Sequence, residues 1–113
     1  PDYAVTGVQT CALPILPKFN NDGRMILNWF DWEIDNSYPK IHPTQKPIPL
    51  LKKLISIFTD YGDVVIDPVA GSGSTLRAAF EINRTAYGFE IKKDFYKLAK
   101  EKMLSEVPMT LKL

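Results

Sequence analysis

The residues best suited to chemistry are a glycine-rich run and an acid that follows it. Asp67–Thr75 reads DPVAGSGST, and Glu90 follows fifteen residues after its end. Gly71 and Gly73 allow a backbone to approach a ligand closely and to adopt positive φ. Glu90 has the spacing expected of an acid that accepts hydrogen bonds from ribose hydroxyl groups. Together these residues predict a pocket for a nucleoside-containing cofactor.

The common phosphate-binding motifs do not fit this run. GSGSTL contains two glycines of G-x-G-x-x-G and lacks the third, and no lysine follows Gly73 as a P-loop requires. Asp67 stands directly before the loop, where it suits a cationic or hydroxyl-rich ligand, such as the aminopropyl portion of S-adenosyl-L-methionine, better than a pyrophosphate. Singly, the glycines are explained by a tight turn and Glu90 by a solvated strand end, but their joint arrangement favours a pocket.

Both acids stand at the ends of predicted strands. Asp63–Asp67 (DVVID) is typical of a short buried strand, and Ala86–Glu90 (AYGFE) of a second one. In a parallel α/β sheet, ligands bind beyond the carboxyl ends of the strands. We therefore expect Asp67 and Glu90 to lie near each other at one edge of a sheet.

Three helices are predicted around these strands. The first begins near Ile48 or Pro49, where a first-turn proline is tolerated, and ends at Tyr61–Gly62. The second covers Ser74–Ile82, and the third follows Asp94 as its N-cap. The order helix, strand, glycine loop, helix, strand, helix predicts the α/β class with a doubly wound sheet.

The flanking segments give weaker signals. Asn21–Gly23 (NDG) is a turn signal and Arg24–Phe30 (RMILNWF) is β-prone, so we expect a hairpin arm there. The tail, Ser105–Leu113, is predicted to be weakly structured. Val5–Ile15 closely resembles the conceptual translation of a widely used sequencing-adapter oligonucleotide. We therefore interpret residues 1–15 as an artefact and the reading frame as interrupted near residue 16, a real apolar loop or edge strand being the alternative.

Composition narrows the class of protein. The 113 residues are 45% hydrophobic with a net charge of +1, which suits one small domain or a piece of a larger one and neither requires nor excludes nucleic acid. Cys11 and His42, the single cysteine and histidine, cannot form a disulfide or a zinc site alone. No apolar run approaches the roughly 18 residues of a membrane span. We expect a cytoplasmic protein without a metal.

A longer pattern resembles a known family. Residues His42–Leu104 resemble the C-terminal part of prokaryotic and phage DNA adenine-N6 or cytosine-N4 methyltransferases. His42–Pro47 (HPTQKP) is similar to their motif X, Asp67–Thr75 to motif I and Gly88–Glu90 to motif II. The first two motifs together are highly specific, and the order X, I, II resembles the circularly permuted β class. The resemblance implies a partial Rossmann-like methyltransferase fold.

The resemblance also implies a cofactor, S-adenosyl-L-methionine, and the residues that bind it. Asp67 and the adjacent loop would line its methionine side, Glu90 would accept from the ribose hydroxyls, and Thr44 with Lys46 would approach the carboxylate. His42 would position the motif X loop rather than act as a base. Val69 and Ala70 depart from the family, which often has Phe and Cys there, but keep the lining apolar. The implied cofactor-binding residues are His42, Thr44, Lys46, Asp67, Pro68, Val69, Gly71, Ser72, Gly73, Ser74 and Glu90.

The family's catalytic motif, Asp/Asn/Ser-Pro-Pro-aromatic, is absent, because no two of the nine prolines are adjacent. The β class carries this motif and its target-recognition region before motif X. We therefore expect residues 16–41 to end the recognition region or a linker, 42–104 to form the cofactor half and 105–113 to be a tail. The cluster Trp29–Trp32 would then pack on the core, with base stacking by Trp29 or Trp32 as the alternative.

The expected function is that of a restriction-modification type DNA methyltransferase acting on double-stranded DNA, on adenine N6 rather than cytosine N4. With two confident strands and open sheet edges, we expect this chain alone to be marginally stable and inactive. Two alternatives remain open from the residues: an NAD(P)-binding Rossmann dehydrogenase, or a non-catalytic cofactor-binding module of a split methyltransferase.

Overall fold

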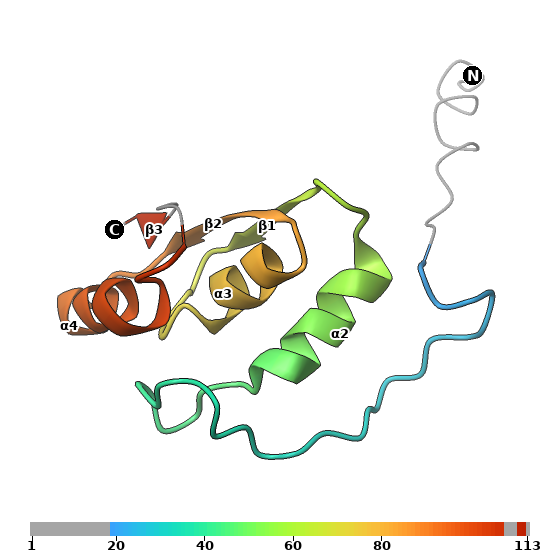
Figure 1. Ribbon diagram of the computed structural model, residues 1–113, viewed down its shortest axis with the longest axis horizontal. Coiled ribbons are helices and arrows are strands. Elements are labelled where there is room, and N and C mark those ends of the chain that lie inside the picture. The colour runs from blue at the N-terminus through green and yellow to red at the C-terminus, as the bar shows by residue number, and fades with distance from the viewer. Residues whose placement is uncertain (1–18, 108–110, 113) are drawn as a thin grey trace, which may run out of the picture.

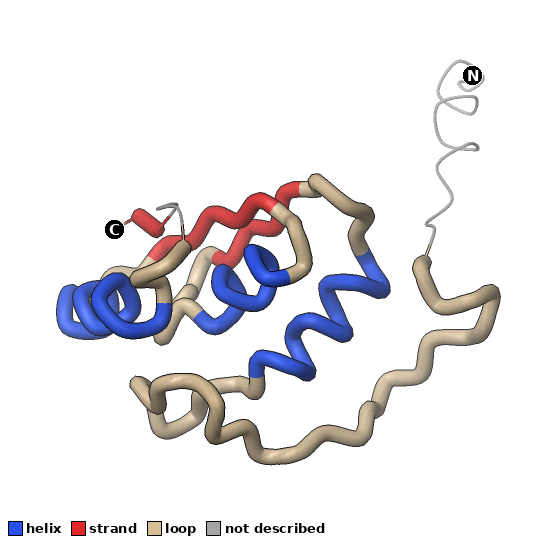
Figure 2. Tube along the Cα trace, viewed as in Figure 1, coloured by secondary structure: helices blue, strands red, loops and turns tan. Residues whose placement is uncertain are grey.

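A three-stranded parallel sheet with helices on one face forms the body of the protein (Figures 1 and 2). The computed structural model describes residues 19–107 and 111–112. The sheet order is β1-β2-β3, and both neighbouring pairs are parallel. The elements are α2 (Ile48–Phe58), β1 (Val64–Asp67), α3 (Ser74–Glu81), β2 (Thr85–Phe89), α4 (Lys93–Leu98), η1 (Ala99–Met103) and β3 (Leu111–Lys112).

The predicted α/β order is confirmed, with boundaries close to those expected. Pro49 lies in the first turn of α2, where its missing N–H costs no helical hydrogen bond. Asn83 closes α3 with a φ of 63°, and its carbonyl accepts a hydrogen bond from the N–H of Gly62 at 3.0 Å. This contact joins the two turns that flank β1 and β2, so the parallel strands begin side by side.

The core lies between the sheet and the helices. α3 packs on β1 and β2, and α2 packs on α3 from the outside. Leu76 and Met103 are fully buried, and burying each such side chain stabilises the fold by about 1.5–3 kcal/mol. Small residues let α3 lie close to the strands. The buried apolar cluster comprises Ile48, Ile55, Ala70, Leu76, Ala78, Ala79, Ala86, Ala99, Met103 and Leu104.

The opposite face of the sheet is apolar and exposed. Val64, Ile66, Tyr87 and Phe89 alternate along β1 and β2 and are 42–64% exposed. Parallel sheets usually carry helices on both faces, and the described residues cover only one. Phe58 of α2 and Phe80 of α3 stand at helical positions whose spacing suits an inward face, but both are exposed. The described part of the chain therefore leaves a large apolar surface open.

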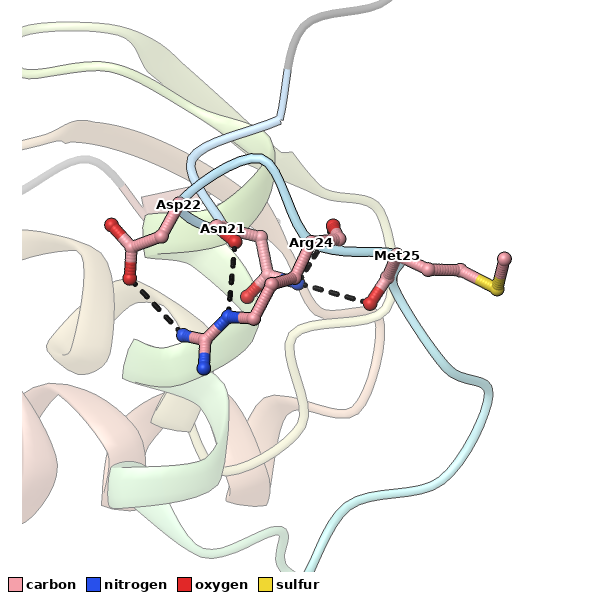
Figure 3. A network of polar contacts seen from close by, with 4 residues as sticks. All are labelled: Asn21, Asp22, Arg24 and Met25. Carbon is pink, nitrogen blue, oxygen red and sulfur yellow. Dashed lines mark hydrogen bonds and ion pairs between the residues drawn. The ribbon is translucent and has the colours of Figure 1, made fainter.

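The predicted hairpin arm is wrong. Residues 19–47 form turns and bends without a strand, and Asn21–Arg24 is a turn in which the N–H of Arg24 donates to the carbonyl of Asn21 at 2.9 Å. The Asn21 side-chain amide donates to the carbonyls of Arg24 and Met25, each at 3.1 Å, and the Arg24 guanidinium pairs with Asp22 (Figure 3). These local bonds occupy the carbonyls that a strand ladder would need.

The core-packing prediction for the aromatic cluster is also wrong. Trp29 is 62% exposed and Trp32 is 58% exposed. The extended segment that carries them runs outside α2 and is attached to the body at its two ends (Figure 2). At the first end, the N–H of Asn20 donates to the carbonyl of Ile57 at 2.8 Å. At the other, Tyr38 contacts α3.

The last helix and the tail differ from expectation in detail. α4 begins at Lys93 after an N-cap at Lys92, so Asp94 lies in the first turn rather than at the cap. A carboxylate there still interacts favourably with the helix dipole. The tail adds β3, whose Leu111 and Lys112 pair with the end of β2, so these two residues are not weakly structured as predicted. The adapter-like residues 1–15 lie outside the described residues. No helix of the described part is long and apolar enough to cross a membrane.

Candidate functional site

A cavity of about 480 Å³ opens at the carboxyl ends of β1 and β2. Its first wall, defined here as residues 67–75, is the glycine loop. The N–H of Ala70 donates to the carbonyl of Phe89 at 2.8 Å, and the N–H of Gly73 donates to the carbonyl of Ala70 at 2.8 Å. Asp67 accepts from the N–H of Val69 at 3.0 Å and so turns the chain at the end of β1. Backbone bonds thus hold this wall against the end of β2.

Glu90, the acid that directly follows β2, is hydrogen-bonded to the first wall. Its side chain is 7% exposed. Oε2 accepts a hydrogen bond from the N–H of Gly71, and Oε1 accepts one from the N–H of Lys92, both at 2.8 Å. An ionised carboxylate has about four acceptor sites, so two backbone donors leave capacity for hydroxyl groups of a ligand. Glu90 therefore positions the loop in addition to facing the cavity, a role that spacing alone did not indicate.

The two glycines of the loop have different structural roles. Gly73 has a φ of +81°, and a Cβ added there would lie 3.1 Å from Leu104 Cδ1, so it permits close packing of α3 on the segment after η1. Gly71 has a φ of +55° and open space on its Cβ side. The predicted positive φ is confirmed at both positions. Gly71 leaves room at the cavity, whereas Gly73 is a packing residue.

Two buried hydroxyl groups complete the loop. Ser72 and Ser74 are 6% and 5% exposed, and their Oγ atoms lie 2.8 Å apart. Each hydroxyl can both donate and accept, so this pair satisfies part of its own hydrogen-bonding capacity and keeps the remainder for the cavity.

The second wall, defined here as residues 42–47, is the HPTQKP loop. His42 Nδ1 accepts from the N–H of Thr44 at 3.1 Å and lies 3.0 Å from Thr44 Oγ1. The His42 ring also lies 4.7 Å from the Phe95 ring, centroid to centroid. Gln45 accepts from the N–H of Ile41 at 3.0 Å and donates to the carbonyl of Pro39 at 2.9 Å. His42 is thus bonded within this loop and packed against Phe95.

The cavity brings together nine of the eleven residues predicted to bind the cofactor. Pro68 and Gly73 are the two that do not line it. Phe95 lines the cavity although its spacing in the last helix suits a core residue, and Thr75, predicted only as part of the motif, also lines it. The lining residues from that set are His42, Thr44, Lys46, Asp67, Val69, Gly71, Ser72, Ser74 and Glu90. Ala70, expected in the lining as part of the loop, also lines the cavity, and the lining residues that were not predicted are Gln45, Leu51, Thr75, Ile91, Lys92 and Phe95.

The charges of the cavity are divided between its walls. Asp67 and Glu90 place two carboxylates at the strand ends, whereas Lys46 comes from the second wall and Lys92 follows β2. Such a site suits a ligand with a cationic group and hydroxyls on one side and a carboxylate on the other. Among the described residues, no three His, Cys, Asp or Glu side chains gather as a metal site would require.

A family model described as "DNA methylase", and named for N6 and N4 methyltransferases, matches residues 15–101. The chain belongs to this family. It resembles the DNA adenine methyltransferase YhdJ of Escherichia coli K12, with 44% identity over 57 residues, which are 50% of this chain and 19% of the relative.

Solved structures of DNA methyltransferases share the fold. The complex of M1.HpyAVI with S-adenosyl-L-methionine (SAM) is 42% identical, with a TM-score of 0.53 over 55% of this chain and 30% of the other. The cytosine-N4-specific PvuII DNA methyltransferase is 27% identical, with a TM-score of 0.53 over 63% of this chain and 25% of the other. The chain thus spans about a third of these proteins or less. The fold is the partial Rossmann-like methyltransferase fold that was predicted.

A polar cluster joins the elements that carry the two walls. Glu81 on α3 accepts from the Tyr38 hydroxyl at 2.6 Å and from Arg77 Nε at 2.6 Å, and forms an ion pair with Lys52 of α2. Arg77 also donates to the carbonyl of Met103 at 3.0 Å. Tyr38 lies just before the second wall, and α3 follows the first. Their separation along the chain, 43 residues between Tyr38 and Glu81, left no local signal for sequence reasoning.

The cluster has a clear electrostatic signature. Burial alone would raise the pKa of Glu81, but hydrogen bonds from Lys52, Tyr38 and Arg77 outweigh burial and lower its pKa from 4.5 to about 2. The hydrogen bond to Glu81 raises the pKa of the Lys52 ammonium, and with burial it raises that of the Tyr38 hydroxyl. Glu81 is therefore ionised, and Lys52 and Tyr38 protonated, at neutral pH.

Proposed function

We propose that the cavity binds SAM and that the chain is the cofactor-binding part of a DNA methyltransferase. The observation that carries this proposal is the meeting of the glycine loop, Glu90 and the HPTQKP loop around one cavity. The presence of SAM in the similar M1.HpyAVI crystal supports it. The cofactor, when bound, supplies a methyl group from its sulfonium centre.

Each wall would recognise a different part of the cofactor. The remaining acceptor capacity of Glu90 would receive the ribose hydroxyls, and the Asp67 carboxylate would attract the cationic methionine end. Thr44 and Lys46 of the second wall would approach the cofactor's carboxylate. The buried Ser72 and Ser74 hydroxyls would offer further polar contacts beside the loop.

The proposed substrate of the whole enzyme is double-stranded DNA, with the N6 amine of adenine as the methyl acceptor. The 44% identity over half of this chain to YhdJ, named as an adenine methyltransferase, supports adenine. This chain contains no adjacent prolines and so no Pro-Pro-aromatic motif. Its sheet also keeps an open apolar face. We therefore propose that it transfers no methyl group alone.

Calorimetric titration of the 113-residue chain tests cofactor binding. S-Adenosylhomocysteine, the demethylated product, should bind, and NADH should not. The Glu90→Gln variant should bind S-adenosylhomocysteine more weakly than the wild type does, because the amide offers fewer acceptor sites than the carboxylate. Binding of NADH in preference to S-adenosylhomocysteine would support a dehydrogenase and contradict the proposal. Glu101→Gln, a change at an exposed residue of η1 that does not line the cavity, is the matched control.

Transfer is tested separately with SAM carrying a labelled methyl group and double-stranded DNA. The expected result is no label in the DNA above a protein-free control. Label on DNA would overturn the proposal that the chain is inactive alone, and its position, adenine N6 or cytosine N4, would identify the acceptor directly.

A further inference from the structure

A second cavity, of about 340 Å³, lies behind the HPTQKP loop. Gln45 and Lys46 line both this cavity and the cofactor cavity, so the second wall is the partition between them. The remaining lining comes largely from the extended segment before that loop, including Trp32, Asp35 and Lys40. The volume falls within the roughly 300–1,000 Å³ range of small-molecule sites.

We propose that this second cavity binds one nucleotide of the DNA substrate, a neighbour of the methylated base. This inference rests on the proposed function of the chain. The loop of residues 42–47 separates the cavity from the cofactor site, so a base bound there does not receive the methyl group. The site therefore fixes the position of the DNA strand rather than taking part in the reaction.

The aromatic part of the site is Trp32. Its ring borders the cavity while the residue remains 58% exposed, so one face is accessible to a ligand. Exposed aromatic rings are the usual stacking platforms for nucleobases, because every base has a π-face. A Trp that does not pack in the core is thereby given a role.

The base-reading group is Asp35. Its Oδ1 accepts a hydrogen bond from the N–H of Ser37 at 2.9 Å, whereas Oδ2 is shielded from solvent and has no partner among the described residues. A carboxylate oxygen that accepts from one donor keeps capacity for a second, so Oδ1 can also accept from a ligand in the cavity. Carboxylates accept from the N4 amine of cytosine in this way, so we assign the cavity to a base with an exocyclic amine.

A lysine completes the nucleotide chemistry. Lys40 lines this cavity but not the cofactor cavity, and it is exposed, so its ammonium group can meet a phosphate with little loss of solvation. An aromatic ring, a carboxylate acceptor and a cation together match a base and its phosphate. An acidic peptide or a lipid headgroup would leave Trp32 and Asp35 unused.

Fluorescence of two single-tryptophan variants of the full chain tests the inference. Trp29→Phe leaves Trp32 as the reporter, and Trp32→Phe leaves Trp29, which is equally exposed and does not line the cavity. Titration with deoxycytidine monophosphate, with S-adenosylhomocysteine present to fill the cofactor cavity, should quench Trp29→Phe and leave Trp32→Phe unchanged. Equal quenching of both variants, or no quenching of either, would overturn the proposal.

A second comparison tests the carboxylate. Deoxyuridine monophosphate replaces the amine by a carbonyl, so it should bind about fivefold more weakly than deoxycytidine monophosphate, and deoxyribose 5-phosphate weaker still. Asp35→Asn should remove this preference, whereas Asp31→Asn, on the same segment but outside the cavity, should keep it. Equal affinity for all three ligands would show phosphate binding only and overturn the assignment of a base.

The two proposals fail in different ways. If S-adenosylhomocysteine binds in calorimetry but deoxycytidine monophosphate quenches neither variant, the second cavity is not a nucleotide site and the cofactor proposal stands. If deoxycytidine monophosphate quenches only Trp29→Phe but S-adenosylhomocysteine never binds, the proposed cofactor function fails instead. Trp32→Phe should bind S-adenosylhomocysteine as the wild type does, which shows that the variant is folded.

Discussion

The two walls of the cofactor cavity are built in opposite ways. The first wall, residues 67–75, is held by backbone hydrogen bonds to the end of β2 and to Glu90, and its centre is buried. The second wall, residues 42–47, is largely exposed and is held by its own side chains, above all by His42 and Gln45. The first wall is therefore part of the fold, whereas the second is a loop laid across it.

Because of this difference, substitutions in the two walls should affect protein stability and ligand affinity differently. A change in the first wall disturbs the packing of α3 and the strand ends, so the free energy of unfolding and ligand affinity should fall together. A change in the second wall loses few buried contacts, so affinity should fall with little change in stability. Substitutions in the Glu81 cluster, which Glu81 forms with Tyr38, Lys52 and Arg77, should have effects between these extremes.

The largest effect is expected from Gly73→Ala in the first wall. The new Cβ would lie 3.1 Å from Leu104 Cδ1 at a φ of +81°, and strain and overpacking together should lower the free energy of unfolding by about 2–4 kcal/mol. Gly62→Ala is the matched control, because its φ is +83° but open space surrounds it, so it should cost only about 1 kcal/mol. Denaturant titration measures the free energy of unfolding of both variants. Equal losses would show that the atoms around residue 73 move to accommodate the new Cβ.

Glu90→Gln is expected to have the next largest effect. The amide oxygen can accept from only one of the two backbone donors, Gly71 and Lys92, and its NH₂ group would face the other. The free energy of unfolding should fall by about 1–3 kcal/mol, and affinity for S-adenosylhomocysteine should fall about tenfold. Thermal unfolding and calorimetry measure the two losses. A loss of affinity with unchanged stability would show that Glu90 acts on the ligand alone and does not hold the loop.

The first wall was the more predictable of the two, for physical reasons. Strand and helix periodicity around Asp67 and Ser74 is local, and an acid at the end of each parallel strand places both at one sheet edge. Glycine at positions of positive φ follows from the steric limits of all other residues. These arguments need no knowledge of distant contacts, and the loop, its flanking elements and most of its lining residues were predicted.

The remaining features depend on partners far apart in the sequence. Tyr38, Lys52 and Arg77 come from three segments, and nothing near any of them indicates that all would meet on Glu81. β3 has two residues, too few for a periodic pattern, and exists because β2 offers an unpaired edge. The β-prone Arg24–Phe30 segment has no partner strand among the described residues, and its first two carbonyls accept from the Asn21 side chain.

Acid titration of Glu81→Gln tests the link between the walls. Because the pKa of Glu81 falls from 4.5 to about 2 on folding, its ionised form stabilises the protein fully above about pH 5. That contribution is lost as the pH falls from about 5 toward 2, so wild-type stability should drop in this window more steeply than that of Glu81→Gln. At neutral pH the variant should be about 1–2 kcal/mol less stable. Glu101→Gln is the control, and parallel pH profiles for wild type and Glu81→Gln would contradict the link.

The smallest change in stability is expected from His42→Ala in the second wall. The substitution removes the acceptor for the Thr44 N–H and the contact with Phe95, both at a half-exposed site, so the free energy of unfolding should change by less than about 0.5 kcal/mol. Affinity for S-adenosylhomocysteine should nevertheless fall about threefold to tenfold, because the loop must be ordered when the ligand binds.

His42→Asn separates loop shape from ring chemistry. An asparagine oxygen can accept from the Thr44 N–H much as Nδ1 does, so this variant should recover most of the affinity that alanine loses. Calorimetry measures the affinity, and thermal unfolding confirms that all three proteins are equally stable. If His42→Asn binds S-adenosylhomocysteine as weakly as His42→Ala does, the imidazole ring itself contacts the ligand. If alanine lowers stability as much as Gly73→Ala does, the second wall belongs to the fold after all, and the contrast between the walls is lost.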